Sequence, residues 1–417
     1  MDGQGEKKAF NNTALLIALC WIVYTCSYLG KLGYNANITQ IEKAYSLSHA
    51  TAGMVSTFFF FAYGIGQIVN GIFCKKYNVK WFVFGSLLIS GLMNLLVGFS
   101  KDFTFIKYFW LINGAALSVL WPSLIRLLSE TLDKAHIGRA VMVMGTTVAT
   151  GTFFVYGLSA LFVALGKYQV MFFLAGILLP SIAVLWMLSY PILVKRKAEN
   201  TTDELQPKTI STEKKRLGWL WLPISILAVF AVFDNLVKDG LTTWVPMILK
   251  ETYSLPDYIS ILLTMLLPIL AIFGTSVAVL LHKKVKDFVV LCSLLFLVAG
   301  VSIGLVILFM PTGWFVVTLV CFGAVSCLMA GVNNIITSMT PLYWKEKLNA
   351  GLTAGVLNGF CYVGSTLSAY GLGLIADKGS WNAVFWLLFS LCAVAVGLCV
   401  CYGIINTIRR SKNNSVG

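Results

Sequence analysis

A lysine stands inside a stretch that is otherwise suited to lipid. Tyr24, Tyr28, Lys31 and Asn35 are spaced four, three and four residues apart, so on a helix of about 3.6 residues per turn they share one face. A cationic and aromatic face on a membrane helix is expected to line a cavity, because a charge facing lipid is costly. The alternative is that Lys31 snorkels to the outer interface beside Tyr34. We favour the cavity, where Lys31 would bind an anion.

A second lysine, Lys238, has long apolar stretches on both sides, which makes snorkelling to either surface difficult. Asp234 precedes it by four residues, on the same helical face, and predicts an internal ion pair. Asp239 lies on another face, and Asn235 and Thr242 are placed to add hydrogen bonds. The pair either only neutralises charge inside the bundle, or substrate or a proton competes for it. We favour the functional interpretation.

Two further groups of polar residues fall within apolar runs. Tyr63, Gln67 and Asn70 lie on one helical face and are candidates to line the same cavity. Arg126 precedes Glu130 by four residues, near the expected cytoplasmic end of its helix. For Arg126 and Glu130 we favour a structural or gating ion pair over a role in substrate binding.

The elements that must position these residues are membrane helices. The chain has 417 residues, of which 58% are hydrophobic and 12% charged, whereas a soluble protein carries about 25% charged residues. About twelve apolar runs are each long enough to cross a bilayer as a helix, the structure that satisfies its own backbone in lipid. The spans are expected to begin near Thr13, Leu47, Lys80, Phe103, Ile137, Tyr168, Gly218, Pro256, Phe288, Gly313, Leu348 and Ser380.

The basic residues predict the orientation. With the N-terminus inside, 22 of the 31 Lys and Arg fall in cytoplasmic segments and six on the outer side. This bias follows the positive-inside rule and predicts a multi-pass protein of the cell membrane with both termini cytoplasmic. The net charge of +14 is therefore a signal of topology, and no nucleic-acid partner is expected. The first apolar run is too long for a signal peptide, contains Lys31 and has no small-residue cleavage site.

Residues typical of enzymes and metal sites do not form patterns. The ten cysteines are scattered through apolar runs without CxxC pairs or metal spacing, and they are interpreted as small core residues. The three histidines, His49, His136 and His282, fall at expected span ends. No catalytic triad or phosphate-binding loop is visible. We expect no enzyme activity, no metal and no cofactor.

One charged segment, residues 196–217, interrupts the hydrophobic pattern and predicts a cytoplasmic linker. It separates an N-terminal half, residues 1–195, from a C-terminal half, residues 218–417, with about six spans each. Lys31 and Lys238 each follow the cytoplasmic start of the first helix of their half by about 20 residues. Two six-helix halves around a central site are typical of transporters that work by alternating access.

Short motifs occur in order along the chain. They are Tyr24-x3-Tyr28-x2-Lys31; Ala62-Tyr63-Gly64 with Gly71; Trp121-Pro122 with Arg126; Val237-Lys238-Asp239-Gly240 with Trp244 and Pro246; and Gly351, Ala354, Gly355, Gly359 and Tyr362. Together they resemble the organophosphate:phosphate antiporter family of the major facilitator superfamily, which includes the glycerol-phosphate and hexose-phosphate transporters. The resemblance implies an all-α fold of 12 transmembrane helices in two six-helix halves. Asn358 and Tyr362 are added as candidate substrate-binding residues.

The departures from the family pattern concern charge. They are Lys31 and Lys238, where the family has arginine; Gln67, where it often has lysine; Thr147, where it often has histidine; and Asp234 and Asp239, where acids are unusual. Arginine binds phosphate through two parallel hydrogen bonds, whereas lysine is a point charge. A monoanion, a carboxylated sugar or a zwitterion would therefore suit this site better than a dianionic phosphate ester. The superfamily's Gly-x3-Asp-Arg loop is also changed, to Gly71-x3-Lys75-Lys76.

These patterns predict a secondary active transporter of a small organic anion, resembling carriers of organophosphates or sugar acids. Coupling would be anion exchange (antiport), as the resemblance implies, or proton symport through Asp234. The alternatives are a non-transporting ligand sensor on the same fold and a multidrug exporter. The expected partners are the anion and membrane lipid, and a monomer is expected.

Overall fold

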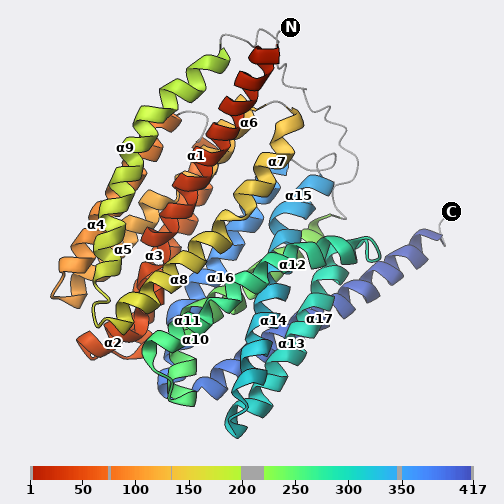
Figure 1. The fold of residues 1–417 in the computed structure, drawn as a ribbon. Helices are drawn as coiled ribbons and strands as arrows, with labels where there is room; N and C mark the ends of the chain where they lie inside the picture. Colours follow the sequence, from red (N-terminus) through yellow and green to blue (C-terminus); the bar gives the residue numbers. More distant parts are fainter. Residues whose placement is uncertain (1–2, 74–76, 133, 199–219, 345–349, 415–417) are drawn as a thin grey trace. The chain divides into compact units, whose positions relative to one another are not determined.

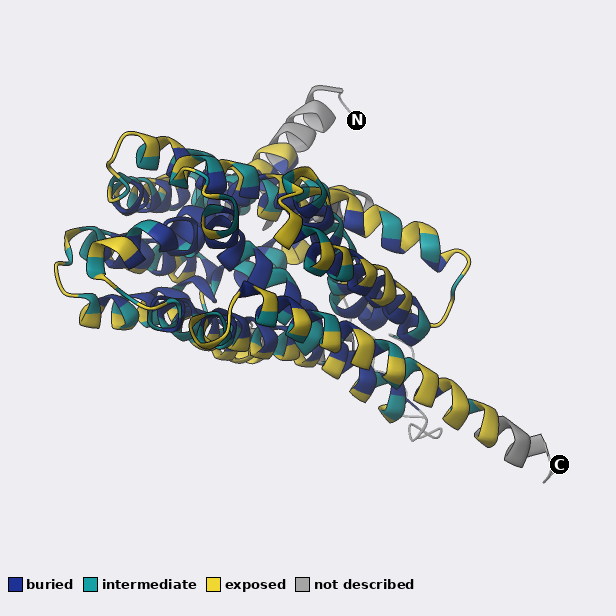
Figure 2. Cartoon of the chain, turned by 90° about the horizontal axis from the view of Figure 1, so that it is seen from below, coloured by how far each residue is buried: buried dark blue, intermediate teal, exposed yellow. Residues whose placement is uncertain are grey.

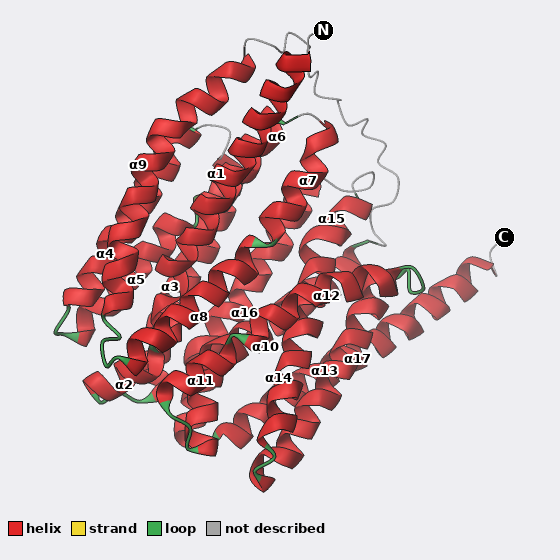
Figure 3. Ribbon diagram, in the orientation of Figure 1, coloured by secondary structure: helices red, strands yellow, loops and turns green. Residues whose placement is uncertain are grey.

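The computed structural model describes residues 3–73, 77–132, 134–198, 220–344 and 350–414. Its regular elements are helices, and the described residues contain no strand (Figure 3). Within these ranges, 12 helical stretches are long and apolar enough to cross a membrane. The predicted polytopic all-α fold is therefore confirmed. Residues 199–217 of the predicted linker and the motif residues Lys75 and Lys76 lie outside the described ranges.

The span starts agree closely with those expected from hydropathy. The fourth and ninth spans begin at Phe103 and Phe288, as expected, and the largest difference is in the fifth, which begins at Val143 rather than Ile137. Lys134–Gly145 forms a helix of its own before the next one begins at Thr147. Hydropathy alone does not reveal such a break, because both sides of it are helical and the residues that flank it, such as Met144 and Val148, are apolar.

The helices form two compact units. The first unit comprises the described residues of Met1–Tyr34 and Ala62–Lys215. Its helices are most of α1 (Gly3–Ala36), the second part of α3 (His49–Phe73), α4 (Val79–Phe99), α5 (Phe103–Leu117), α6 (Leu120–Thr131), α7 (Lys134–Gly145), α8 (Thr147–Ala164) and α9 (Val170–Ala198).

The second unit comprises the described residues of Asn35–Phe61 and Arg216–Gly417. Its helices are α2 (Ile38–Tyr45), the first part of α3, α10 (Trp221–Tyr253), α11 (Asp257–Thr264), α12 (Leu266–His282), α13 (Phe288–Phe309), η3 (Met310–Thr312), α14 (Phe315–Asn334), the π-helix η4 (Ile335–Met339), α15 (Thr340–Tyr343), α16 (Ala350–Lys378) and α17 (Trp381–Asn414). Segment 35–61 thus belongs to the N-terminal half in sequence but packs within the unit that holds the C-terminal helices.

Glycines let the helices approach closely. In the second unit α16 (blue) runs along α10 (green) in Figure 1. A Cβ added at Gly364 of α16 would collide with the carbonyl oxygen of Val232 on α10. In the first unit, a Cβ at Gly91 of α4 would overlap Pro180 of α9. Small residues at such crossings are typical of helix packing in membranes.

The outward-facing side chains are apolar, as expected for a surface in contact with lipid. Leu188, Val301, Val320 and Val400 are each more than half exposed. Along α17 the exposed residues form a nearly continuous stripe (Figure 2). A soluble protein rarely exposes so much contiguous apolar surface. Several candidate site residues, such as Asn35, Gln67 and Asp234, are instead buried within their unit.

Candidate functional site

The first candidate neighbourhood surrounds Lys31 on α1. Its Nζ lies 4.3 Å from the ring centroid of Tyr63 on α3 and 5.4 Å from that of Tyr28. Both rings are buried. An ammonium at these distances is attracted to the negative face of an aromatic ring. The charge of Lys31 is therefore held against aromatic rings within the bundle.

Tyr24 extends this aromatic wall. Its ring packs edge to face on Tyr28, with centroids 5.7 Å apart, and lies 4.8 Å from the ring of Trp121 on α6. Gly151 on α8 leaves room for Tyr28, because a Cβ there would come within 2.7 Å of Tyr28 Cβ. Three of the four residues expected on one face of the first helix therefore share one neighbourhood in the first unit.

Gln67 is engaged in a contact between helices. Its Nε2 donates to the carbonyl oxygen of Ser118 at 3.2 Å, and Asn70 Nδ2 donates to Ser118 Oγ at 2.9 Å. Ser118 follows the C-terminal end of α5, so both amides fasten α3 to the break between α5 and α6. Gln67 and Asn70 thus contribute to helix packing, and substrate binding by Gln67 stays a prediction, whereas Tyr63 directly contacts Lys31.

Asn35, the fourth residue of the expected face, lies in the second unit. It is 2% exposed; its Nδ2 donates to Thr243 Oγ1 at 2.9 Å, and its Oδ1 accepts from Ser56 Oγ at 2.9 Å. Asn35 therefore joins the end of α1 to α3 and α10. Helical spacing predicted that Asn35 lies on the same face as Lys31. The hydrogen-bond partners of Asn35, however, belong to the second unit.

The second candidate neighbourhood surrounds Lys238 on α10. Lys238 Nζ donates to Asn235 Oδ1 at 3.0 Å and lies 3.8 Å from Asp239 Oδ1. Asn235 Nδ2 donates to Ser365 Oγ of α16 at 3.2 Å, and Ser365 Oγ donates to the other Asp239 oxygen, Oδ2. The carboxylate paired with Lys238 is thus that of Asp239, and Ser365 links it back to Asn235.

Asp234 is fully buried beside this network. Its Oδ2 accepts from Asn333 Nδ2 of α14 at 3.2 Å. Its Oδ1 has no hydrogen-bond partner among the described residues. Lys238 is near enough for its charge to act on this carboxylate. A buried carboxylate with an unsatisfied oxygen is costly, so Asp234 is a group that gains from a proton or another cation.

The network also contains residues that were not predicted as site residues. Asn333 Nδ2 also donates to Asn235 Oδ1 at 3.0 Å and lies 3.7 Å from Cys361 Sγ. The π-helix η4 begins two residues after Asn333, and such π-turns often occur at functional sites. The adjacent polar residues Asn333 and Asn334, within a long apolar run, were the available signal. Ser365 gave no comparable signal, apart from lying one helical turn after Cys361.

Asn358 and Tyr362 lie on α16, two turns and one turn before Thr366 respectively, and are partly exposed. Thr366 Oγ1 donates to the carbonyl oxygen of Tyr362 at 2.7 Å. Asn358 precedes Ser365 by two helical turns, which places both on one face of α16. Asn358 and Tyr362 therefore stay predicted substrate-binding residues, on the helix that also carries Ser365.

The ion pair expected in the first unit does form. Arg126 Nε donates to Glu130 Oε1 at 2.7 Å, and an Arg126 terminal nitrogen donates to the carbonyl oxygen of Tyr77 at 3.1 Å. The arginine therefore joins α6 to Tyr77, two residues before the start of α4. A gating role for Arg126 and Glu130 stays a prediction.

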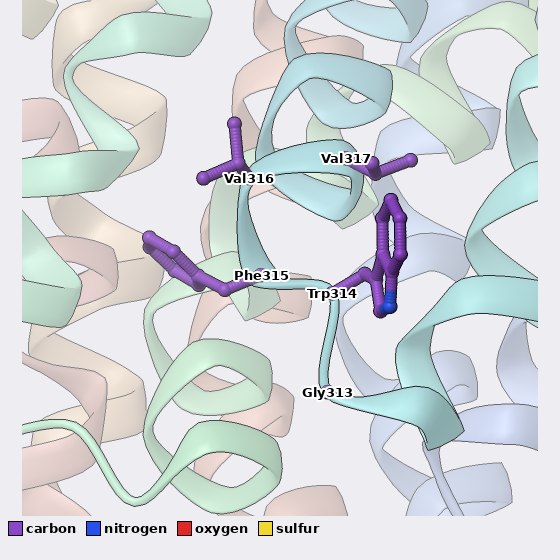
Figure 4. A pocket seen from close by; sticks show the side chains of 5 residues that line it. All are labelled: Gly313, Trp314, Phe315, Val316 and Val317. Atoms are coloured by element: carbon purple, nitrogen blue, oxygen red, sulfur yellow. The ribbon is translucent and has the colours of Figure 1, made fainter.

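No metal site is found, since the described residues contain no cluster of three or more His, Cys, Asp or Glu side chains that could hold an ion. One open pocket lies where η3 meets α14, lined by residues 313–317 (Figure 4). Its exposed side chains, such as Trp314 and Val316, are apolar and carry no charge. That chemistry suits lipid and does not suit an anion.

Comparison with known proteins agrees with this fold. Residues 20–349 match the family model of the Major Facilitator Superfamily. The chain is 23% identical to a probable hexose phosphate transport protein of Chlamydia pneumoniae over 90% of this chain and 88% of that one. It is 21% identical to the membrane sensor protein UhpC of Escherichia coli (strain K12), covering 91% and 89%.

A third relative is the glycerol-3-phosphate transporter of Bacillus subtilis (strain 168), 23% identical over 90% of this chain and 89% of that one. Among solved structures, a bacterial homologue of the human lysosomal transporter Spinster superposes with a TM-score of 0.69 at 14% identity, covering 92% of this chain and 91% of that one. These relatives belong to the group that the motifs resemble, and the structural match supports the fold.

Proposed function

Because the chain belongs to the Major Facilitator Superfamily, we propose that it is a secondary transporter that moves a small organic anion by alternating access. Its two six-helix halves, residues 1–195 and 218–417, would move around the central residues, with both termini cytoplasmic and the monomer as the working unit. The observation that carries the proposal is a lysine inside an apolar helix of each unit, Lys31 and Lys238, each within a polar or aromatic neighbourhood. Charges placed in this way mark substrate pathways in membrane proteins.

The charge balance favours a substrate with a single negative charge. Asp239 lies beside Lys238 and offsets part of its charge, whereas Lys31 is held by aromatic rings. A lysine point charge also lacks the paired donors that grip a phosphate dianion. A sugar acid, a monoanionic phosphate ester or a zwitterion fits this balance, although the relatives include proteins named for hexose phosphate and glycerol-3-phosphate.

Two coupling modes are compatible with this site. In the first, one anion exchanges for another and Asp234 keeps a constant protonation state. In the second, Asp234 carries a proton with the anion. An Asp234→Asn variant separates them: under proton coupling it loses accumulation driven by a pH gradient but keeps counterflow without a gradient. If Asp234→Asn accumulates substrate as the wild type does, proton coupling through Asp234 is wrong.

The anion site is tested by counterflow in proteoliposomes with sugar phosphates, inorganic phosphate, carboxylates and amino acids. We expect at least one anion class to be transported, and Lys31→Ala or Lys238→Ala to lower that rate by about tenfold or more, the effect of losing about 1.4 kcal/mol of binding. Lys101→Ala, at an exposed lysine in the loop before α5, is the matched control and should transport normally. Wild-type rates in either test variant would show that the site is misplaced.

A ligand sensor is the second candidate function, because one relative is named a membrane sensor protein. A sensor would bind an anion through the same lysines without moving it. Binding measured by the ligand's effect on thermal unfolding, together with absent counterflow for the same ligand, would favour the sensor over the transporter.

A further inference from the structure

The ring of His49, the first residue of α3, lies between two carboxylates. His49 Nδ1 is 3.1 Å from Glu42 Oε2, and His49 Nε2 is 3.5 Å from Glu251 Oε1. Glu42 belongs to α2 and Glu251 to α10, and all three residues lie in the second unit. A neutral imidazole has one N–H donor and one acceptor. It therefore cannot donate to ionised carboxylates on both sides.

The three side chains can share their protons in two ways, and both ways hold the same number of protons. The ring is an imidazolium between two carboxylates, or it is neutral and accepts from a protonated carboxyl while donating to the other. Each arrangement holds one proton more than a neutral ring with two ionised carboxylates. Burial raises the pKa of Glu42, against the opposing hydrogen bond and charge of His49, which also favours holding that proton.

The surroundings hold the ring in place. Asp377 of α16 accepts from the backbone N–H groups of His49 and Ala50 at 2.9 and 2.8 Å. Trp381 of α17 donates its Nε1–H to Glu251 Oε2 at 2.7 Å, and its ring lies 5.2 Å from that of His49. The ring therefore has little freedom to turn away from Glu42 and Glu251.

The other charged groups near the cluster are also defined. Lys43 of α2 and Lys250 of α10 both pair with Asp257 of α11, at 2.6 and 3.1 Å. This second set fastens α2 to α10 and α11 independently of His49. The side chain of His49 is 18% exposed and that of Glu251 39%, so protons can exchange with the solvent.

We propose that His49, together with Glu42 and Glu251, is a proton-binding site on the predicted outer side, and that its proton holds segment 35–61 against the C-terminal helices. The segment belongs to the N-terminal half in sequence, so the bound proton fastens one half to helices of the other. When the proton leaves, two carboxylates face an imidazole that can donate to only one of them, and the start of α3 is released. The external pH thus sets how readily this side opens, whatever the substrate is.

The test is hydrogen exchange of the intact protein in nanodiscs, followed by mass spectrometry of peptides that cover residues 38–61. After correction for intrinsic exchange rates, the wild type should lose protection in this segment as pH rises from about 6 to about 10. His49→Gln, which cannot bind the proton, should exchange about tenfold faster than the wild type at the acidic end and show no pH-dependent change in protection.

Two further variants keep the result interpretable. His49→Lys retains a cation and should stay protected at the pH where the wild type opens. His282→Gln is the matched control, because His282 lies in the same unit, stacked on Phe288 at 4.9 Å and away from this cluster; it should follow the wild type. Equal protection in the wild type and His49→Gln at every pH, or the same change in His282→Gln, would overturn the proposal.

Discussion

The neighbourhoods of Lys31 and Lys238 differ in how they stabilise a partly buried charge. Lys31 is held by the faces of Tyr28 and Tyr63. Lys238 is held by the amide oxygen of Asn235 and the carboxylate of Asp239. Aromatic rings attract a cation without neutralising it, whereas a carboxylate offsets its charge. In the proposed transporter, the first neighbourhood would attract the anion, and the second would respond when an anion or proton changes the balance.

The two neighbourhoods also tolerate change differently. A cation over a ring is held by a broad, soft attraction. A network of hydrogen bonds is directional, and the loss of one member leaves buried polar atoms without partners. Substitutions in the hydrogen-bonded network around Lys238 should therefore lower stability more than substitutions in the aromatic contact of Lys31.

Removing each lysine charge should affect stability unequally. Lys238→Met leaves Asp239 and the buried Asp234 without their nearby cation, and we expect it to lower the free energy of unfolding by about 3–5 kcal/mol. Lys31→Met should cost about 1 kcal/mol, because methionine also packs well against aromatic rings. Thermal unfolding in detergent measures both. Equal losses would remove the contrast between the two neighbourhoods.

Asn333 should be the most sensitive amide of the second network. Asn333→Leu removes the donor to both Asp234 Oδ2 and Asn235 Oδ1, and we expect a loss of about 2–3 kcal/mol in unfolding free energy. Asn334→Leu, at the adjacent position, is the control and should cost less than about 1 kcal/mol. Urea unfolding followed by fluorescence compares the two, and an equal effect at Asn334 would contradict the assignment.

The aromatic contact of Lys31 should depend on the ring and not on the hydroxyl. Tyr63→Phe keeps the ring that lies 4.3 Å from Lys31 Nζ, so KM for the transported anion should hardly change. Tyr63→Leu loses the cation–π attraction, worth about 1 kcal/mol, and should shift KM about fivefold. If Tyr63→Phe is as impaired as Tyr63→Leu, the hydroxyl matters more than the ring.

The Arg126–Glu130 pair provides a reference outside both neighbourhoods. The Glu130 side chain is 53% exposed, and its oxygen lies 2.7 Å from Arg126 Nε. Glu130→Gln should therefore change the unfolding free energy by less than about 1 kcal/mol. The melting temperature of this variant checks the estimate, and a loss as large as that of Lys238→Met would show that an exposed pair can matter as much as one within the helix bundle.

Much of the fold could be predicted because it depends on local chemistry. Runs of apolar residues of bilayer length predicted the twelve spans, and most of their predicted starts lie within about three residues of those in the structure. The same reasoning found Lys31 and Lys238, because a charge in such a run is conspicuous. Spacing along one helix also predicted the Arg126–Glu130 pair, whose members face each other one turn apart.

The partners of those charges were harder to predict. Helical spacing favoured Asp234 as the acid beside Lys238, yet the ion pair that forms is with Asp239, and Asp234 binds Asn333 of a distant helix. Asn35 shares a helical face with Lys31, but its hydrogen bonds lie in the other unit. His49 was placed only at a span end, with no indication of its two carboxylates.

The physical reason is that some properties depend only on residues close together in the sequence, whereas others depend on how distant helices pack. Which segments are helices, which of them can enter a bilayer and where charges interrupt them can be worked out from neighbouring residues, because backbone satisfaction and hydropathy act within one segment. That Asn333 and Ser365 meet α10, and that α2, α10 and α16 surround His49, is visible only in the folded protein. Those contacts depend on how helices far apart in sequence pack, which no single segment encodes.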